Sequence, residues 1–159
     1  MEYNYKKMNK KYAEEIAYKW KYKGVYSFYD ITSDEDDLKE FLDPNEWENS
    51  FVVLNQSKQL IGFYSYYFKK DIMWLGFGLK PELTGKEYGA DFVEAGIKFG
   101  IKNYDYNQDY LMLAVAKFNQ RAIKVYQKLG FKISEEYLQK TNGGEYEFHK
   151  MKLDLDRRR

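Results

Sequence analysis

The chain has 159 residues, the length of one compact domain, and its 26 Lys and Arg almost balance its 25 Asp and Glu. This balance offers no large basic surface for nucleic acid, and no apolar run is long enough to cross a membrane. The sequence has no cysteine and one histidine, His149, which excludes disulfides, cysteine nucleophiles and metal sites made of several histidines. Without a signal peptide at its start, the protein is expected to be soluble and cytoplasmic, with no membrane or nucleic-acid partner.

Two helices are predicted in the first third of the chain. Apolar residues spaced by four indicate the first, from about residue 9 to residue 20. The second follows Ser33, which could cap it, and ends at Asp43 before a proline. Acidic residues at 34–37 would lie in its first turn, where they favour the positive end of a helix. The acidic run could also attract a cationic acceptor, although a solvated helix start explains it more simply.

Three strands are predicted next, over 50–54, 60–68 and 72–79. Only short polar turns separate them, which indicates an antiparallel meander. Gly76 and Gly78 lie inside the third strand, where glycine indicates a bulge or a close approach by another group.

The second half of the chain alternates helices and strands. A helix is predicted over 88–104, and its glycines at 96 and 100 indicate a surface that the sheet approaches closely. An apolar run over 110–116 predicts a strand buried on both faces. A second helix, over 119–129, ends at a glycine, and two strands joined by a turn over 141–144 complete the chain.

The resulting order is βααβββαβαββ. It predicts one α/β (α+β) domain over 1–159, with a mixed, mostly antiparallel sheet of six to seven strands and helices on both faces. Two parallel strands, each running into a helix N-terminus, are expected to splay around a slot.

The segment PELTGKEYGADF, residues 81–92, joins a strand to the helix that crosses over to the parallel strand. Such a junction exposes unpaired backbone N–H groups at the positive end of a helix, which suits a phosphate. By itself the segment could equally be an ordinary turn. It is neither a P-loop nor a dinucleotide-binding fingerprint, because both of those glycine patterns are absent.

A second segment, AKFNQRAIKVYQKLGF over 116–131, places an asparagine at a helix start and a tyrosine two turns later. Together the two segments resemble the GNAT superfamily of N-acetyltransferases, similar to the ribosomal-protein N-acetyltransferases and their relatives. The resemblance covers the chain from about Ser50 to its end. It implies an acetyl-CoA-binding core over about 50–153, with the helices over about 9–43 on the acceptor side.

The resemblance also implies the residues that bind acetyl-CoA. The pyrophosphate would lie on the backbone of residues 84–90, and the pantetheine arm would pair with the strand at 77–79 almost as an extra strand. The cofactor-binding residues would be Phe77, Gly78, Leu79, Thr84, Gly85, Lys86, Glu87, Tyr88, Gly89, Ala90, Asn119, Ala122 and Tyr126.

The chain departs from the family's Q/R-x-x-G-x-G/A element at two positions. Thr84 stands in place of the usual glutamine or arginine, and Glu87 stands in place of the middle glycine. A carboxylate that pointed inward would repel the pyrophosphate, whereas one that pointed outward would leave the backbone donors in place. We expect Glu87 to point outward, because Gly85 and Lys86 still suit the site.

Acetyl transfer to an amine needs a neutral amine, a stabilised oxyanion and a leaving thiolate that can take a proton. Without cysteine, direct transfer in a ternary complex is the simplest route. By resemblance Tyr126 would be the general acid, although it could instead be a core residue. A backbone N–H near Leu79 would polarise the thioester carbonyl. Asn119 would hydrogen-bond the cofactor, or only cap its helix.

The general base is not identified. The strand glutamate of some relatives corresponds here to Ala114, so a water chain, Asp30 or Asp71 would have to serve. His149 is expected to be solvated or structural.

The acceptor is poorly specified by the sequence. The aromatic residues over 20–30 could wall an amine pocket or belong to the core. The first hypothesis is therefore an acetyl-CoA-dependent N-acetyltransferase acting on a small-molecule or protein amine. The alternative is a catalytically silent acyl-CoA-binding module, and a homodimer is left open.

Overall fold

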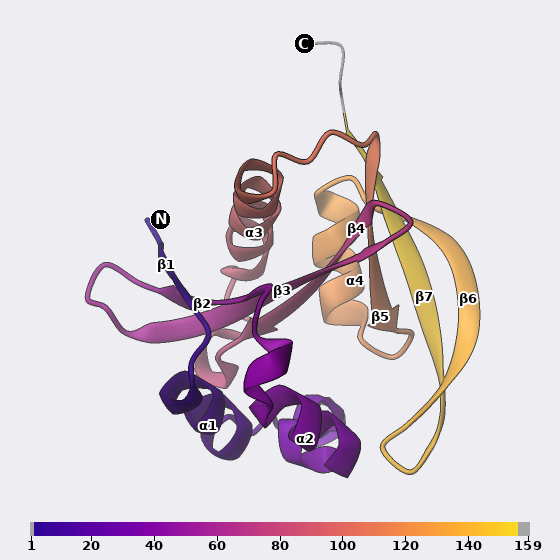
Figure 1. Cartoon of the computed structure of the whole chain (residues 1–159). Coiled ribbons are helices and arrows are strands. Elements are labelled where there is room, and N and C mark those ends of the chain that lie inside the picture. The colour runs from indigo at the N-terminus through magenta and orange to yellow at the C-terminus, as the bar shows by residue number, and fades with distance from the viewer. Residues whose placement is uncertain (1, 156–159) are drawn as a thin grey trace.

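The computed structural model describes residues 2–155 and contains one seven-stranded sheet with the strand order β1-β2-β3-β4-β5-β7-β6 (Figure 1). Within it β4 and β5 are parallel, and the other neighbouring strands are antiparallel. The predicted order of elements and the mixed, mostly antiparallel sheet are therefore confirmed. The strands are β1 (Asn4–Lys7), β2 (Ser50–Leu54), β3 (Leu60–Lys69), β4 (Ile72–Leu79), β5 (Tyr110–Ala116), β6 (Lys132–Thr141) and β7 (Gly144–Asp154).

Two pairs of helices cover the two faces of the sheet. On one face, α3 (Gly89–Asn103) and α4 (Gln120–Lys128) pack on a large core that includes Tyr64 and Leu113. On the other, α1 (Lys10–Lys19) and α2 (Glu35–Leu42) pack on a smaller core around Phe63 (Figure 1). The expected helices on both faces are thus confirmed.

Side chains that cap the helices explain where each one begins. Asn9 accepts a hydrogen bond from the amide of Tyr12 and starts α1, as its spacing predicts. The predicted cap Ser33 is wrong, because Ser33 ends a short 3-10 turn and donates its hydroxyl to the carbonyl of Ser27. Asp34 caps α2 instead and accepts from two amides of its first turn.

The strand β4 runs in unbroken register with β3, so the bulge considered for this strand is not found there. A β-carbon on Gly78 would lie 2.0 Å from Cε1 of Phe63, and one on Gly76 would lie 2.4 Å from Oγ of Ser65. Both glycines therefore make room for side chains of the neighbouring strand.

The close approach predicted for α3 is confirmed. A β-carbon on Gly96 would lie 2.7 Å from Cε1 of Tyr64, which donates its hydroxyl to the carbonyl of Phe92 over 2.6 Å. The helix can therefore lie directly on the aromatic face of the sheet.

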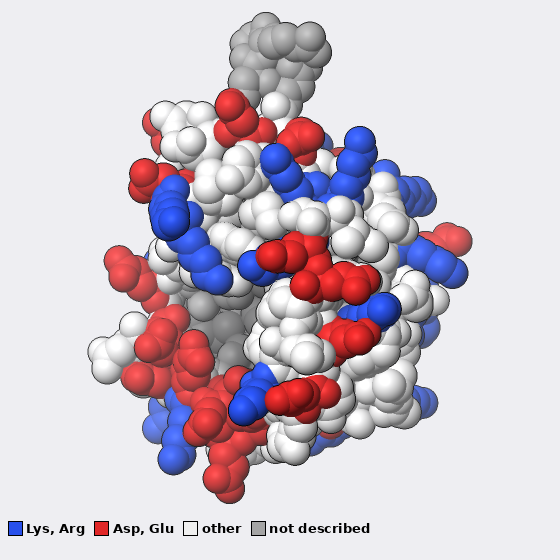
Figure 2. Space-filling view, turned by 90° about the vertical axis from the view of Figure 1, so that its right-hand side faces the viewer, with Lys and Arg blue, Asp and Glu red and all other residues white. Residues whose placement is uncertain are grey.

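The side of the molecule formed by β6 and β7 is hollowed by a recess (Figure 2). Basic side chains gather above this recess and acidic side chains gather below it, on the side of α2 (Figure 2). The hairpin that borders it turns at Asn142 and Gly143, which both have positive φ, at 50° and 76°. This tight turn joins β6, which ends at Thr141, to β7, which begins at Gly144, within the predicted turn over 141–144.

Candidate active site

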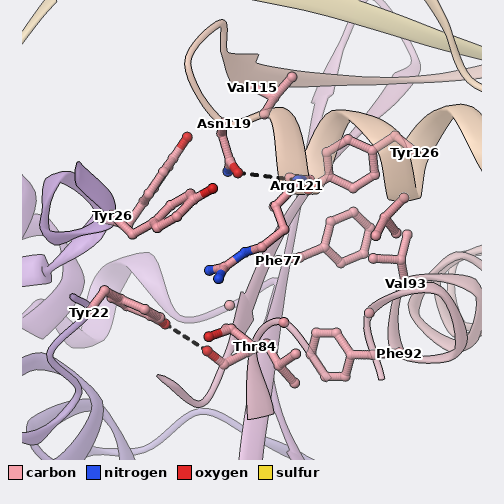
Figure 3. Close-up of a pocket in the computed structure, with 18 of the residues that line it drawn as sticks. Tyr22, Tyr26, Phe77, Thr84, Phe92, Val93, Val115, Asn119, Arg121 and Tyr126 are labelled. Atoms are coloured by element: carbon pink, nitrogen blue, oxygen red, sulfur yellow. Dashed lines mark hydrogen bonds between the residues drawn. The ribbon is translucent and has the colours of Figure 1, made fainter. Parts of the chain in front are cut away.

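The parallel strands β4 and β5 pair only at Trp74–Met112 and Leu75–Leu113. Beyond these pairs the strands diverge, as the sequence predicts, and a cavity of about 860 Å³ lies between them. The starts of α3 and α4 and the 3-10 segment Gly24–Tyr29 complete its walls (Figure 3). We call this space the first cavity.

The segment from Gly85 to Ala90 carries unpaired amides. Gly85, Glu87, Gly89 and Ala90 line the first cavity, whereas the predicted residues Lys86 and Tyr88 do not. Within residues 2–155, no hydrogen bond of ordinary geometry is found from these six amides to the protein. Helix α3 then starts at Gly89 without a side-chain cap, so its positive end is open to the cavity. An anion at this position would therefore meet several donors that need no partner from a side chain.

Two residues of this segment hold left-handed backbone, Gly85 with φ of 72° and Glu87 with φ of 66°. Glycine adopts this conformation without strain, which explains why the family pattern has glycine at the position of Glu87. The Glu87 side chain is exposed at the rim of the cavity. Thr84 differs from its neighbours, because its amide and its hydroxyl both donate to the carbonyl of Pro81.

Arg121 is a cation of the first cavity that the sequence reasoning missed. Its guanidinium carbon lies 4.0 Å from the centroid of the Tyr26 ring, and Nη1 lies 3.3 Å from where a β-carbon on Gly85 would be. No ion pair of Arg121 is found in the described part of the chain. Figure 3 shows its side chain reaching between Tyr26 and Thr84. The available signal was its place in the first turn of α4, two residues after Asn119.

Tyr126 lies deeper in the cavity, with its ring 6.2 Å from that of Phe77 and 5.8 Å from that of Phe131. It packs on the core and also lines the cavity, so the two roles considered for it are compatible. Burial raises the pKa of Tyr126 above its ordinary value, and the nearby Tyr29 raises it further. The hydroxyl therefore keeps its proton at neutral pH.

Asn119 accepts a hydrogen bond from the amide of Ala122 over 3.2 Å and caps α4. The hydroxyl of Tyr29 is buried and has no hydrogen-bond partner of ordinary geometry within residues 2–155. Burial raises the pKa of Tyr29, while the side chain of Asn119 and the backbone of Ala116 oppose this rise. Both side chains line the cavity at the end of β5.

The aromatic segment over 20–30 divides between core and cavity. Trp20 belongs to the smaller core and also lines the first cavity, as do Tyr22, Tyr26 and Tyr29. The hydroxyl of Tyr22 donates to the carbonyl of Leu79 over 2.7 Å (Figure 3). This contact ties the segment to the end of β4, where the pantetheine arm is expected.

Neither of the two candidate general bases, Asp30 and Asp71, lines the first cavity. Ala114, at the position where some relatives have a glutamate, does line it. Asp30 accepts a hydrogen bond from the amide of Tyr22, and Asp71 is exposed in the turn between β3 and β4. Of the two expectations for His149, solvated or structural, the first is wrong. His149 is only 5% exposed, and its Nδ1 lies 3.5 Å from Oε1 of Glu136.

A groove of about 560 Å³ lies on the sheet face that carries α1 and α2. It shares Ala114 and Phe148 with the first cavity, so the two spaces are adjacent where β4 and β5 part. We call it the second groove. Its lining residues are Tyr67, Lys69, Trp74, Ala114, Glu135, Tyr137, Gln139, Phe148 and Lys150.

The family model described as "Acetyltransferase (GNAT) domain" matches residues 6–132. The chain belongs to the GNAT acetyltransferase family. It is therefore an N-acetyltransferase with acetyl-CoA as its cofactor, and the resemblance of its two segments to this family is confirmed. A search of curated protein sequences finds no match.

Solved structures of GNAT proteins share this fold over almost their whole length. Spermidine N-acetyltransferase from Vibrio cholerae in complex with CoA and spermine is 17% identical, with a TM-score of 0.71 over 96% of this chain and 95% of that one. A GNAT acetyltransferase from Bacillus anthracis is 15% identical, with a TM-score of 0.71 over 97% and 95%. A chimera of the Vibrio cholerae enzyme SpeG and hSSAT is 18% identical, with a TM-score of 0.70 over 97% and 96%. At these identities the likeness concerns the fold.

None of the helices in residues 2–155 is long and apolar enough to span a membrane.

Proposed function

We propose that this protein moves an acetyl group from acetyl-CoA to a primary amine of a small molecule or protein, by direct transfer with both substrates bound. The observation that carries the proposal is the adjacency of the two spaces at Ala114 and Phe148. A cofactor entering through the first cavity and an amine entering through the second groove would reach each other there. No acetyl-enzyme step is needed, in keeping with a chain that has no cysteine.

The first cavity suits the cofactor. Its diphosphate would accept hydrogen bonds from the unpaired amides of Gly85 to Ala90, and Arg121 would add a cation beside them. The backbone of Phe77 to Leu79 is free of a β5 partner and would flank the pantetheine arm. When bound, acetyl-CoA supplies an activated acetyl thioester.

Tyr126 is the proposed proton donor. Its Oη holds a proton at neutral pH, because burial raises its pKa, and would give it to the departing sulfur. The ring packs against Phe77 and Phe131, and Tyr126 lines the first cavity, so its hydroxyl would be available to the bound thioester.

Water is the proposed acceptor of the amine's proton. The carboxylates that line the two spaces within residues 2–155 are Glu87, at the anion-binding end, and Glu135, which is paired with Lys150 over 2.8 Å. Glu135 lies in the same cross-strand row as Ala114, where the two substrates would meet, but Lys150 lies between them and holds its carboxylate. The proposed route therefore relies on solvent that enters through the open groove.

A screen of amines with detection of released thiol tests this function. We expect turnover with at least one amine, together with binding of acetyl-CoA. The alternative, a silent acyl-CoA-binding module, is favoured by alanine at position 114 in place of a base. Clear binding of acetyl-CoA without turnover of any amine would support that alternative and contradict the enzyme.

A further inference from the structure

The second groove has two aromatic walls. On one side Tyr67 and Trp74 face each other in the β3–β4 register and are stacked, with centroids 6.0 Å apart and planes at 20°. On the other side Tyr137 and Phe148 lie 5.7 Å apart. Walls of this kind favour an apolar or aromatic body between them.

The charges of the groove are not balanced. Nζ of Lys69 lies 4.6 Å from the centroid of Trp74 and 5.6 Å from that of Tyr67, and no ion pair of Lys69 is found within residues 2–155. Lys150, by contrast, is held by Glu135 over 2.8 Å, and this contact raises the pKa of Lys150. The uncompensated charge of the lining is therefore the ammonium of Lys69.

The position of this ammonium relative to Ala114, which the two spaces share, follows from the strand register. Ala114, where an acetyl group would be delivered, lies just beyond the last pairs of β4 with β5. Lys69 lies at the opposite end, at the turn between β3 and β4, opposite Ile72. Trp74 lies between these two positions along the wall.

We propose that the second groove binds amines that carry an anionic group, such as a carboxylate, at the end remote from the amine, with an apolar or aromatic body between. The amine would lie at Ala114, the body would lie along Trp74 and Tyr137, and the anion would pair with Lys69. This assignment of an acceptor class rests on the proposed function.

The same charge disfavours diamines and polyamines. A cation at the remote end would meet Lys69 rather than a carboxylate. The acidic side chains below the recess do not alter this, because the only carboxylate among the described residues that line the groove is Glu135. Asp34, at the start of the acidic run, is engaged as a helix cap and accepts from the amide of Asn142.

Three amines of one chain length, aminohexanoate, hexylamine and diaminohexane, test the proposal in the whole protein with acetyl-CoA. An aromatic set, (aminomethyl)benzoate, benzylamine and xylylenediamine, repeats it with a flat body. We expect kcat/KM to fall in the order anionic, neutral, cationic, with about a tenfold advantage of the acid over the neutral amine. The substitution Lys69→Met should remove this advantage, so that the variant turns over the acid and the neutral amine with similar kcat/KM.

Lys70→Met is the matched control, because Lys70 is the next residue of the same turn and does not line the groove. A preference for the diamines, or an advantage of the acids that survives Lys69→Met, would overturn the proposal. If no amine is turned over, calorimetry of the N-acetylated products with CoA present gives the same ranking as a binding readout. Acetyl-CoA binding with turnover of diamines alone would reject this inference and keep the proposed function. Selective binding of acetylated acids without turnover of any amine would keep the inferred ligand class and reject the proposed function.

Discussion

The first cavity and the second groove, which share Ala114, would recognise the cofactor and the amine in different ways. The first cavity presents backbone amides over Gly85 to Ala90 and one arginine, whereas the second groove presents side chains from five strands, β3 to β7. Recognition by backbone tolerates changes such as Thr84 and Glu87, because the donors do not depend on the side chain. Recognition by side chains changes with each substitution. A common cofactor site and a variable acceptor site can therefore share one sheet.

The strongest way to separate chemistry from binding in the first cavity is Tyr126→Phe. The ring and its contacts stay, but the proton donor is lost, so kcat should fall about 100-fold. The dissociation constant of acetyl-CoA, measured by calorimetry, should stay within about twofold. Tyr18→Phe is the control, because Tyr18 is 51% exposed on α1. An unchanged kcat in Tyr126→Phe would remove this hydroxyl from the reaction.

The close contact between β4 and β3, beside the first cavity, can be tested through Gly78→Ala. The new methyl group would lie 2.0 Å from the ring of Phe63, which is itself packed 5.4 Å from Phe41. We expect the free energy of unfolding in urea to fall by about 2 kcal/mol. In the control Gly144→Ala, the nearest atom would be at an ordinary 3.5 Å. Equal stability of the two variants would argue against a tight β3–β4 contact.

The substitution Arg121→Ala tests whether this cation contributes to binding of the acetyl-CoA diphosphate. Arg121 as a residue is exposed, so its loss should raise the dissociation constant of acetyl-CoA only about tenfold, or 1.4 kcal/mol. Acetyl-pantetheine, which lacks the diphosphate, should bind both proteins alike. Lys102→Ala on α3 controls for net charge. Equal weakening toward both donors would place Arg121 away from the diphosphate.

The smallest effect is expected from Glu87→Gly, which restores the family's residue at a backbone with φ of 66°. Removal of the carboxylate from the rim should lower the dissociation constant of acetyl-CoA about threefold by reducing repulsion. Glu87→Gln keeps the strained backbone and removes only the charge. A glutamine variant that binds acetyl-CoA no better than the natural protein would contradict this prediction and show that the carboxylate does not repel the cofactor.

Sequence patterns predicted the fold and the first cavity because both follow from contiguous segments. Helix caps such as Asn119, strand runs and the turn around Gly85 act within a few residues. The choice of Asp34 over Ser33 as a cap depended on a 3-10 turn that periodicity does not show. The glycines of β4 were explained by a neighbouring strand rather than by a bulge.

The second groove could not be predicted in the same way. Lys69 and Trp74 are close in sequence, but the opposite wall comes from β6 and β7, more than 60 residues later in the chain. Arg121 was missed because its role depends on Tyr26 and Gly85, which only the fold brings beside it. Burial of His149 likewise depends on the elements that cover β7.

Hydrogen exchange at the backbone amides of Gly85 to Ala90 tests the anion site most directly. Without ligand these amides should exchange rapidly, because no internal hydrogen bond of ordinary geometry is found for them within residues 2–155. Saturating CoA should slow their exchange, while pantetheine without the diphosphate should not. Amides that are already protected in the free protein, or that exchange equally fast with CoA bound, would contradict the backbone site.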